Sequence, residues 1–172
     1  MSAAPPVITF IGKSNSGKTT LLVKLIPELK RRGYRVASIK HSHHNVTMDQ
    51  EGKDSWRHRD AGAEMVALVS GNTVSFVRDY PHEPDVELIR NTYMEGVDIV
   101  LAEGFKWTGL PKIWVFREGN SQPVVKKDDS LIAVVSDEEA LTDLPWISID
   151  DVSGVADLLE KRFLKTDPGE AP

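Results

Sequence analysis

The stretch that decides the fold is "VITFIGKSNSGKT", residues 7–19. Its first five residues are rich in β-branched and apolar side chains, as in a buried parallel strand. The following Gly12-x-x-x-x-Gly17-Lys18-Thr19 matches the phosphate-binding loop (P-loop) pattern in full, and leucines at helical spacing come after it. We therefore predict a P-loop held between a strand and a helix.

Each residue type in this motif has a task in holding phosphate. Glycines let the backbone bend so that several N–H groups face one phosphate, and the helix N-terminus adds its positive dipole end. Lys18 supplies a mobile charge for the β- and γ-phosphates, and Thr19 supplies a hydroxyl for Mg²⁺. The motif does not identify the reaction, because kinases, ATPases, GTPases and ligases all use P-loops.

A second Mg²⁺ ligand is predicted at the end of the apolar run "VDIVLAE", residues 97–103. Glu103 ends this strand, and α/β sheets place their ligands at the carboxyl ends of strands. A solvated acid at a strand end is the alternative interpretation. Asp98 lies at the opposite end of the same strand and is a poor candidate.

A histidine-rich segment, "KHSHHN" at residues 40–45, follows the second predicted strand and leaves the same edge of the sheet. Asp54, Arg57 and Arg59 come shortly afterwards. Three interpretations remain open: a solvated polar loop, a transition-metal site built on imidazoles, and a binding site for substrate or nucleotide phosphate. The phosphate interpretation fits the position of the segment best.

Composition limits the class of protein. The 172 residues carry 21 Lys and Arg against 26 Asp and Glu, a net charge of −5, which argues against a nucleic-acid or membrane-surface partner. The absence of cysteine excludes disulfides and thiolate metal sites. The N-terminal residues lack the pattern of a signal peptide, so we expect a cytoplasmic protein.

Strands and helices alternate along the chain, which predicts an α/β fold, a P-loop NTPase-like, mostly parallel sheet flanked by helices. Residues 64–79 form two β-rich runs around Gly71-Asn72, and we expect this hairpin to make an antiparallel edge. We expect a single nucleotide-binding domain over residues 1–165 and a flexible tail over 166–172. The other expected helices are 54–63, N-capped by Asp54 or Ser55, 84–95 and 148–164, and the other expected strands are 34–41, 111–117 and 130–137.

Five segments together resemble one known family. They are "GKSNSGKTTLL", "IKHSHH", "GKDSWRHRDAGA", "LAEGFK" and "PKIWVFR". The chain resembles the molybdopterin-guanine dinucleotide biosynthesis adaptor family, MobB, from about residue 7 to residue 137 or beyond. The later segments are far more specific than the P-loop itself.

The resemblance implies a homodimeric P-loop GTPase-like protein with extended β structure near its interface. It implies binding of GTP with Mg²⁺, weak hydrolysis at most, and a partner guanylyltransferase of the MobA type, which joins GMP to molybdopterin. The nucleotide ligands would be Gly12, Lys13, Ser14, Asn15, Ser16, Gly17, Lys18, Thr19 and Thr20, with Thr19 and Glu103 holding Mg²⁺. The adjoining pocket, by our hypothesis for molybdopterin phosphate, would be lined by Lys40, His41, His43, His44, Asp54 and Arg57.

The chain departs from expectation in two places. Ser42 stands where the family motif commonly has Thr, and it keeps the hydroxyl. No Asn-Lys-x-Asp guanine-reading motif is present; Asp137, after "AVVS", could accept from guanine N1–H and N2–H, and a capping acid is the equal alternative.

Four further expectations concern function. Lys13 after the first glycine resembles the lysine that crosses to the partner subunit's nucleotide in dimeric P-loop ATPases of the MinD type. Lys18 and Asp54 are the candidate catalytic groups, with Arg57 or Arg59 for charge stabilisation. Trp107 is a candidate partner contact. The rival functions are a small-molecule kinase and a metal-insertion GTPase that uses the histidine segment.

Overall fold

The structure, a computed structural model, describes residues 4–42, 49–119, 128–139 and 142–164. The chain divides into two compact units, Met1–His41 with Val86–Pro172, and Ser42–Asp85. Compactness alone does not define an independent domain, so the single domain over 1–165 stays a prediction. The expected tail, 166–172, lies outside the described residues.

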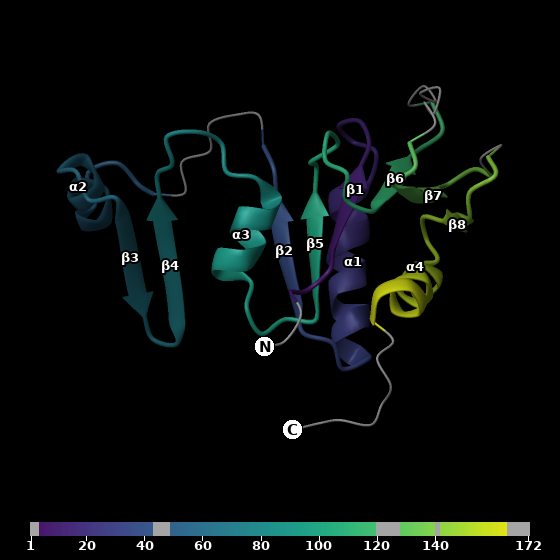
Figure 1. Cartoon of the computed structure of the whole chain (residues 1–172), viewed down its shortest axis with the longest axis horizontal. Coiled ribbons are helices and arrows are strands. Elements are labelled where there is room, and N and C mark those ends of the chain that lie inside the picture. Colours follow the sequence, from purple (N-terminus) through teal and green to yellow (C-terminus); the bar gives the residue numbers. More distant parts are fainter. Residues whose placement is uncertain (1–3, 43–48, 120–127, 140–141, 165–172) are drawn as a thin grey trace. The chain divides into compact units, whose positions relative to one another are not determined.

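The first unit is built on a six-stranded sheet with strand order β2-β5-β1-β6-β7-β8 (Figure 1). Each pair of neighbouring strands is parallel. The expected P-loop α/β class is therefore confirmed. The elements of this unit are β1 (Val7–Ile11), α1 (Lys18–Arg31), β2 (Val36–Lys40), α3 (Val86–Tyr93), β5 (Ile99–Glu103), β6 (Lys112–Phe116), β7 (Leu131–Ser136), β8 (Trp146–Ser148), α4 (Val152–Leu159) and the π-helical turn η1 (Glu160–Leu164).

Strand β1 lies inside the sheet, between β5 and β6. Its register pairs Phe10 with Glu103 on β5, and Ile11 with Trp114 on β6. Because all the strands run in one direction, their carboxyl ends meet at one edge of the sheet. That edge carries the P-loop and the residues that follow β2, β5, β6 and β7.

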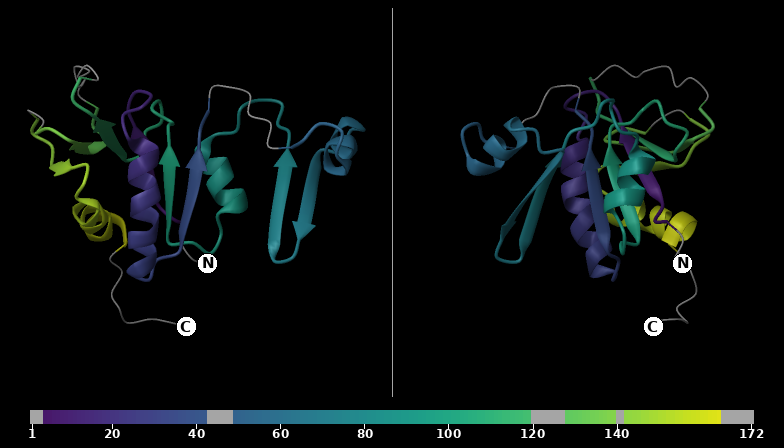
Figure 2. Two further views of the ribbon diagram at one scale, coloured as in Figure 1. Left: turned by 180° about the vertical axis from the view of Figure 1, so that it is seen from behind. Right: turned by 60° about the vertical axis from the view of Figure 1, so that its left-hand side comes forward.

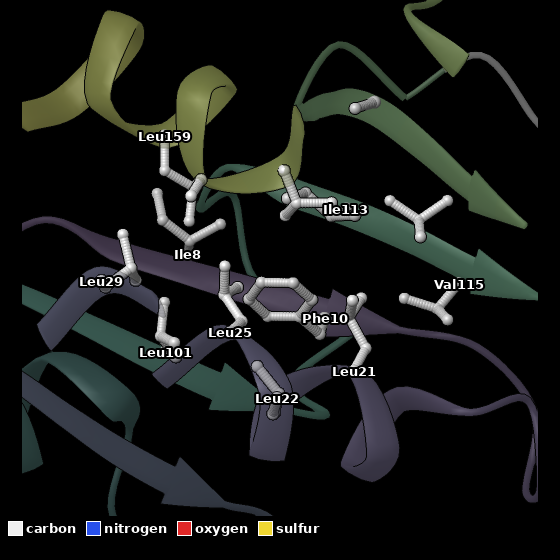
Figure 3. Packing of buried hydrophobic residues seen from close by; sticks show 14 of the residues in the cluster. Ile8, Phe10, Leu21, Leu22, Leu25, Leu29, Leu101, Ile113, Val115 and Leu159 are labelled. Atoms are coloured by element: carbon white, nitrogen blue, oxygen red, sulfur yellow. The ribbon is translucent and has the colours of Figure 1, made fainter. Parts of the chain in front are cut away.

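The two faces of the sheet are covered by different helices (Figure 2). Alternate strand residues point to each face. On one face the buried leucines of α1 and Leu159 of α4 pack on residues such as Ile8 and Phe10; Figure 3 shows Phe10 between Leu21 and Leu25. On the other face Val86 of α3 packs on Val7, Val100 and Ala102. This packing fixes the strand ends that form the site.

An ionic cluster ties the C-terminal end of α1 to α4. The Arg32 side chain, only 13% exposed, bonds Glu28 at 2.7 Å, Asp157 at 2.6 Å and Glu160. Burial works against its charge, but the hydrogen bonds that Arg32 donates to the three carboxylates raise its pKa above the ordinary value. The cluster fixes the helix whose N-terminus follows the P-loop.

The second unit holds α2 (Asp54–Asp60) and a hairpin of β3 (Met65–Ser70) and β4 (Thr73–Arg78). The two-residue turn predicted at Gly71-Asn72 is confirmed, with Ser70 paired to Thr73. The expected place of the hairpin at the edge of the main sheet is wrong. Among the described residues the only strand pairing of β3 and β4 is with each other, in a separate two-stranded sheet.

One face of the hairpin is apolar and exposed. The antiparallel register puts four large apolar side chains on that face: Met65, Val69, Val74 and Phe76, which are 47–67% exposed. A lone two-stranded hairpin is marginal in water, so this face is suited to a partner.

The predicted N-cap of α2 is wrong. The N-cap is Lys53, not Asp54 or Ser55, and it makes no side-chain capping bond. The Ser55 hydroxyl instead donates to Asp49 Oδ1 at 2.8 Å. No helix within the described residues has the length and apolar character to span a membrane.

Candidate nucleotide-binding site

The P-loop connects β1 to α1 and depends on two glycines that cannot carry a side chain. A Cβ on Gly12 would lie 2.1 Å from the carbonyl oxygen of Val115 on β6. Gly17 has φ +94, and a Cβ there would lie 2.9 Å from Cδ1 of Ile149. The loop backbone therefore approaches Val115 and Ile149 too closely for a side chain at either glycine.

The lysine of the motif lies over its own loop. Lys18 Nζ donates to the carbonyl oxygens of Gly12 at 3.0 Å and Lys13 at 2.6 Å, and to Ser16 Oγ at 3.3 Å. Partial burial lowers the pKa of Lys18, with Lys40 adding to this effect and Glu103 opposing it. The ammonium group is thus held at the loop by contacts that a phosphate can replace.

The two predicted Mg²⁺ ligands lie in direct contact. Thr19 Oγ1 lies 2.9 Å from both carboxylate oxygens of Glu103 and donates to them. Lys40 Nζ lies 3.6 Å from the same carboxylate, and the Glu103 side chain is only 14% exposed. A hydroxyl and a carboxylate at this spacing are the oxygen ligands that Mg²⁺ takes beside a P-loop, so these residues fit the ion.

The segment after β5 is strained and packs on the first histidine of the cluster. Gly104 has φ +106 and Phe105 φ +55. A Cβ on Gly104 would lie 3.0 Å from the Cβ of His41, and the ring of His41 lies 4.8 Å from that of Phe105. His41 N donates to the carbonyl oxygen of Glu103 at 2.9 Å. His41 is therefore fixed beside Glu103.

On the other side of the P-loop lie Asp137 and a residue that sequence reasoning missed. Asp137 follows β7, and its Oδ1 accepts from the backbone N–H of Glu118 at 2.8 Å. Arg117 follows β6 and brings its guanidinium against Gly17. The segment "PKIWVFR" ends in Arg117, but the sequence does not predict its contact with Gly17, because that contact depends on β6 lying beside β1.

No contact among the described residues places the remaining predicted residues at the carboxyl edge of the main sheet. Asp54 and Arg57 belong to α2 in the second unit, where Arg57 Nη1 lies 3.8 Å from Asp54 Oδ1. His43 and His44 lie outside the described residues. Within the described ranges no three His, Asp or Glu side chains converge as a metal site would need.

The arrangement can hold a triphosphate chain. The P-loop backbone and Lys18 would meet the phosphates, Thr19 and Glu103 would hold Mg²⁺ on the β5 side, and Asp137 lies on the β7 side. Bound Mg²⁺ supplies charge neutralisation of the β- and γ-phosphate oxygens.

Comparisons with known proteins identify the family of the chain. The family model of "Molybdopterin guanine dinucleotide synthesis protein B", MobB, matches residues 7–137. A "Molybdopterin-guanine dinucleotide biosynthesis adapter protein" of Haemophilus influenzae is 38% identical over 90% of this chain and 88% of its own length. The protein of the same name from Escherichia coli is 37% identical over 93% of this chain and 94% of its own length.

Solved structures of MobB proteins have a similar fold. A crystal structure of "molybdopterin-guanine biosynthesis protein B (mobB)" superposes with a TM-score of 0.75 at 29% identity, covering 92% of this chain and 99% of that one. The structure of Bacillus subtilis MobB gives a TM-score of 0.66 at 25% identity, over 89% of this chain and 97% of that one. With its P-loop, its sheet order and these matches over nearly its whole length, the chain belongs to the MobB family.

Proposed function

We propose that this chain is a GTP-binding adaptor of molybdenum cofactor biosynthesis. It assists the conversion of molybdopterin to molybdopterin guanine dinucleotide by a MobA-type guanylyltransferase in the cytoplasm. The observation that carries the proposal is the contact between the P-loop and the acid at the end of β5. Thr19 Oγ1 lies 2.9 Å from the Glu103 carboxylate, and we assign both groups to Mg²⁺. The names of its curated relatives supply the pathway.

Guanine recognition is assigned to Asp137. Its Oδ1 accepts one hydrogen bond from the N–H of Glu118, and each carboxylate oxygen keeps a lone pair for the base. A carboxylate accepts from N1–H and N2–H of guanine, and adenine lacks this pair of donors. The site therefore favours GTP over ATP.

Titration calorimetry with GTP and ATP, each with Mg²⁺, tests this assignment. GTP binds more tightly than ATP, and phosphate release stays far below the roughly 1–100 s⁻¹ of kinases. Asp137→Asn weakens GTP and strengthens xanthosine triphosphate, whose C2 carbonyl accepts from the new amide. ATP preference, or rapid ADP release on adding a small acceptor, would refute the proposal in favour of a kinase.

Molybdopterin phosphate is assigned to the residues beside Glu103, on the side of β2. Lys40 and His41 lie there, and the histidine segment continues from them. Alanine at both His43 and His44 lowers guanine dinucleotide formation in a reconstituted assay while GTP affinity stays unchanged. Full dinucleotide formation by this variant would contradict the assignment.

The homodimer is assigned to the exposed apolar face of the hairpin. Phe76 lies at the centre of that face and is 47% exposed. Sedimentation equilibrium gives a dimer for the unaltered chain and a monomer for Phe76→Asp. Val23→Asp, at a 65% exposed site on α1, is the matched control and stays dimeric. The crossing of Lys13 to a partner's nucleotide stays a prediction.

A further inference from the structure

Arg117 brings a positive charge to the P-loop from a neighbouring strand. Ile113 and Val115 point to the face that α1 covers, and Arg117 continues this alternation past the end of β6. A Cβ placed on Gly17 would lie 3.1 Å from its Nε and 3.6 Å from its Nη2. The missing side chain of Gly17 is what lets the guanidinium lie against the first turn of α1.

No carboxylate among the described residues neutralises the charge of Arg117. Within the described part of the chain Arg117 forms no ion pair or hydrogen bond, and its side chain is exposed. A guanidinium stays charged at all ordinary pH values. It lies beside the positive end of α1 and near the loop that holds Lys18, so several positive groups gather where an anion would be stabilised.

The strand order indicates which part of a bound nucleotide Arg117 would contact. Glu103 and Thr19 lie on the β5 side of the P-loop, whereas Arg117 lies on the β6 side. The next residue, Glu118, donates its N–H to Asp137, which directly follows β7. Arg117 therefore lies between the P-loop and the carboxylate assigned to guanine, away from the Mg²⁺ ligands.

We infer that Arg117 binds the α- and β-phosphates of the nucleotide and makes no contact with the γ-phosphate. The inference rests on the proposed nucleotide-binding function. It separates the site into two halves: Glu103 and Thr19 hold the ion and the γ end, and Arg117 holds the end nearer the base. GTP and GDP then depend on Arg117 equally.

Calorimetry on the full-length chain tests the inference with GTP and GDP, each with Mg²⁺. Arg117→Ala weakens both nucleotides by the same factor, about tenfold to a hundredfold for one charge-assisted contact. Arg117→Lys restores part of the affinity, because lysine keeps the charge but not the fork of donors. Arg90→Ala is the matched control, since the Arg90 side chain on α3 bonds only Asn91 among the described residues, and the affinities of this variant stay unchanged.

Two results would overturn the inference while GTP binding stands: an Arg117→Ala variant with unaltered affinities, or one that loses affinity for GTP alone. Preference for ATP by the unaltered chain would refute guanine recognition; equal losses for ATP and ADP in Arg117→Ala would still support the phosphate contact. A chain that binds none of the four nucleotides would refute both.

Discussion

The ion pair of Lys112 and Asp128 gives the sharpest stability prediction. The Lys112 side chain is 4% exposed, and its Nζ lies 2.7 Å from Asp128 Oδ2 and from Ser130 Oγ. The hydrogen bond from Lys112, with those from Ser130, lowers the pKa of Asp128 to about 2. Asp128→Asn removes the carboxylate and leaves a buried ammonium group with one neutral oxygen and a weak amide acceptor.

The magnitude follows from the burial of the two partners. Breaking a fully buried pair costs about 3–5 kcal/mol, because the remaining charge is desolvated. The Asp128 side chain is 41% exposed, so water reaches the ammonium group in the variant. We therefore discount the cost to about 2 kcal/mol, which lowers the melting temperature by about 4–8 °C for a chain of this size.

Urea unfolding followed by tryptophan fluorescence measures this change. Asp129→Asn is the matched control, because the described structure gives its side chain no ion pair, and its stability stays within about 0.5 kcal/mol of the unaltered chain. Lys112→Met combined with Asp128→Leu recovers most of the loss, since apolar side chains replace a buried pair at little cost.

The sign of the pH dependence is fixed by the lowered pKa. A carboxyl group whose folded pKa lies below its ordinary value of 3.8 stabilises the fold above that value. The advantage of the unaltered chain over Asp128→Asn is thus constant near pH 7 and shrinks as the pH falls from about 4 toward 2. Equal stability of Asp128→Asn and Asp129→Asn at pH 7 would refute this reasoning.

Three other substitutions test the core and the site. Leu25→Ala, at a fully buried position of α1, lowers the free energy of unfolding by about 2–5 kcal/mol in urea titrations. Gly12→Ala abolishes nucleotide binding in calorimetry, because its Cβ would lie 2.1 Å from the Val115 carbonyl oxygen; unaltered affinity would contradict the packing of the loop. Thr19→Val removes the gain in GTP affinity on adding Mg²⁺ but keeps metal-free binding, since the hydroxyl beside Glu103 is lost; an undiminished Mg²⁺ effect would exclude Thr19 as a ligand.

Much of the fold was predictable because its signals are local. The apolar run of β1, the leucine spacing of α1 and the Gly71-Asn72 turn each specify one element within a few residues. Strand β8 was missed because it has three residues, too few for an alternating pattern to stand out. The place of the hairpin was missed because alternation predicts a strand but not its partners.

The site residues also divide into those that a local sequence signal predicts and those that depend on the sheet order. The P-loop and Glu103 were predictable, since a motif and a strand-end acid are read along the chain. Arg117 was not, because its contact with Gly17 joins residues a hundred positions apart and depends on which strand follows β1 in the sheet. The contribution of Asp54 to the site stays a prediction, as its unit is described by itself.

The strand order has a consequence for how the chain folds as it is synthesised. Strands β1 and β2 emerge first, yet they are not neighbours: β5, beginning at Ile99, lies between them, and β6 completes the other side of β1. A nascent chain shorter than about residue 99 thus has both strands and no parallel partner for either. The edges of β1 and β2 therefore stay unpaired until β5 and β6 have been synthesised. Such non-local pairing favours slow folding, and the unpaired edges need protection from aggregation until then.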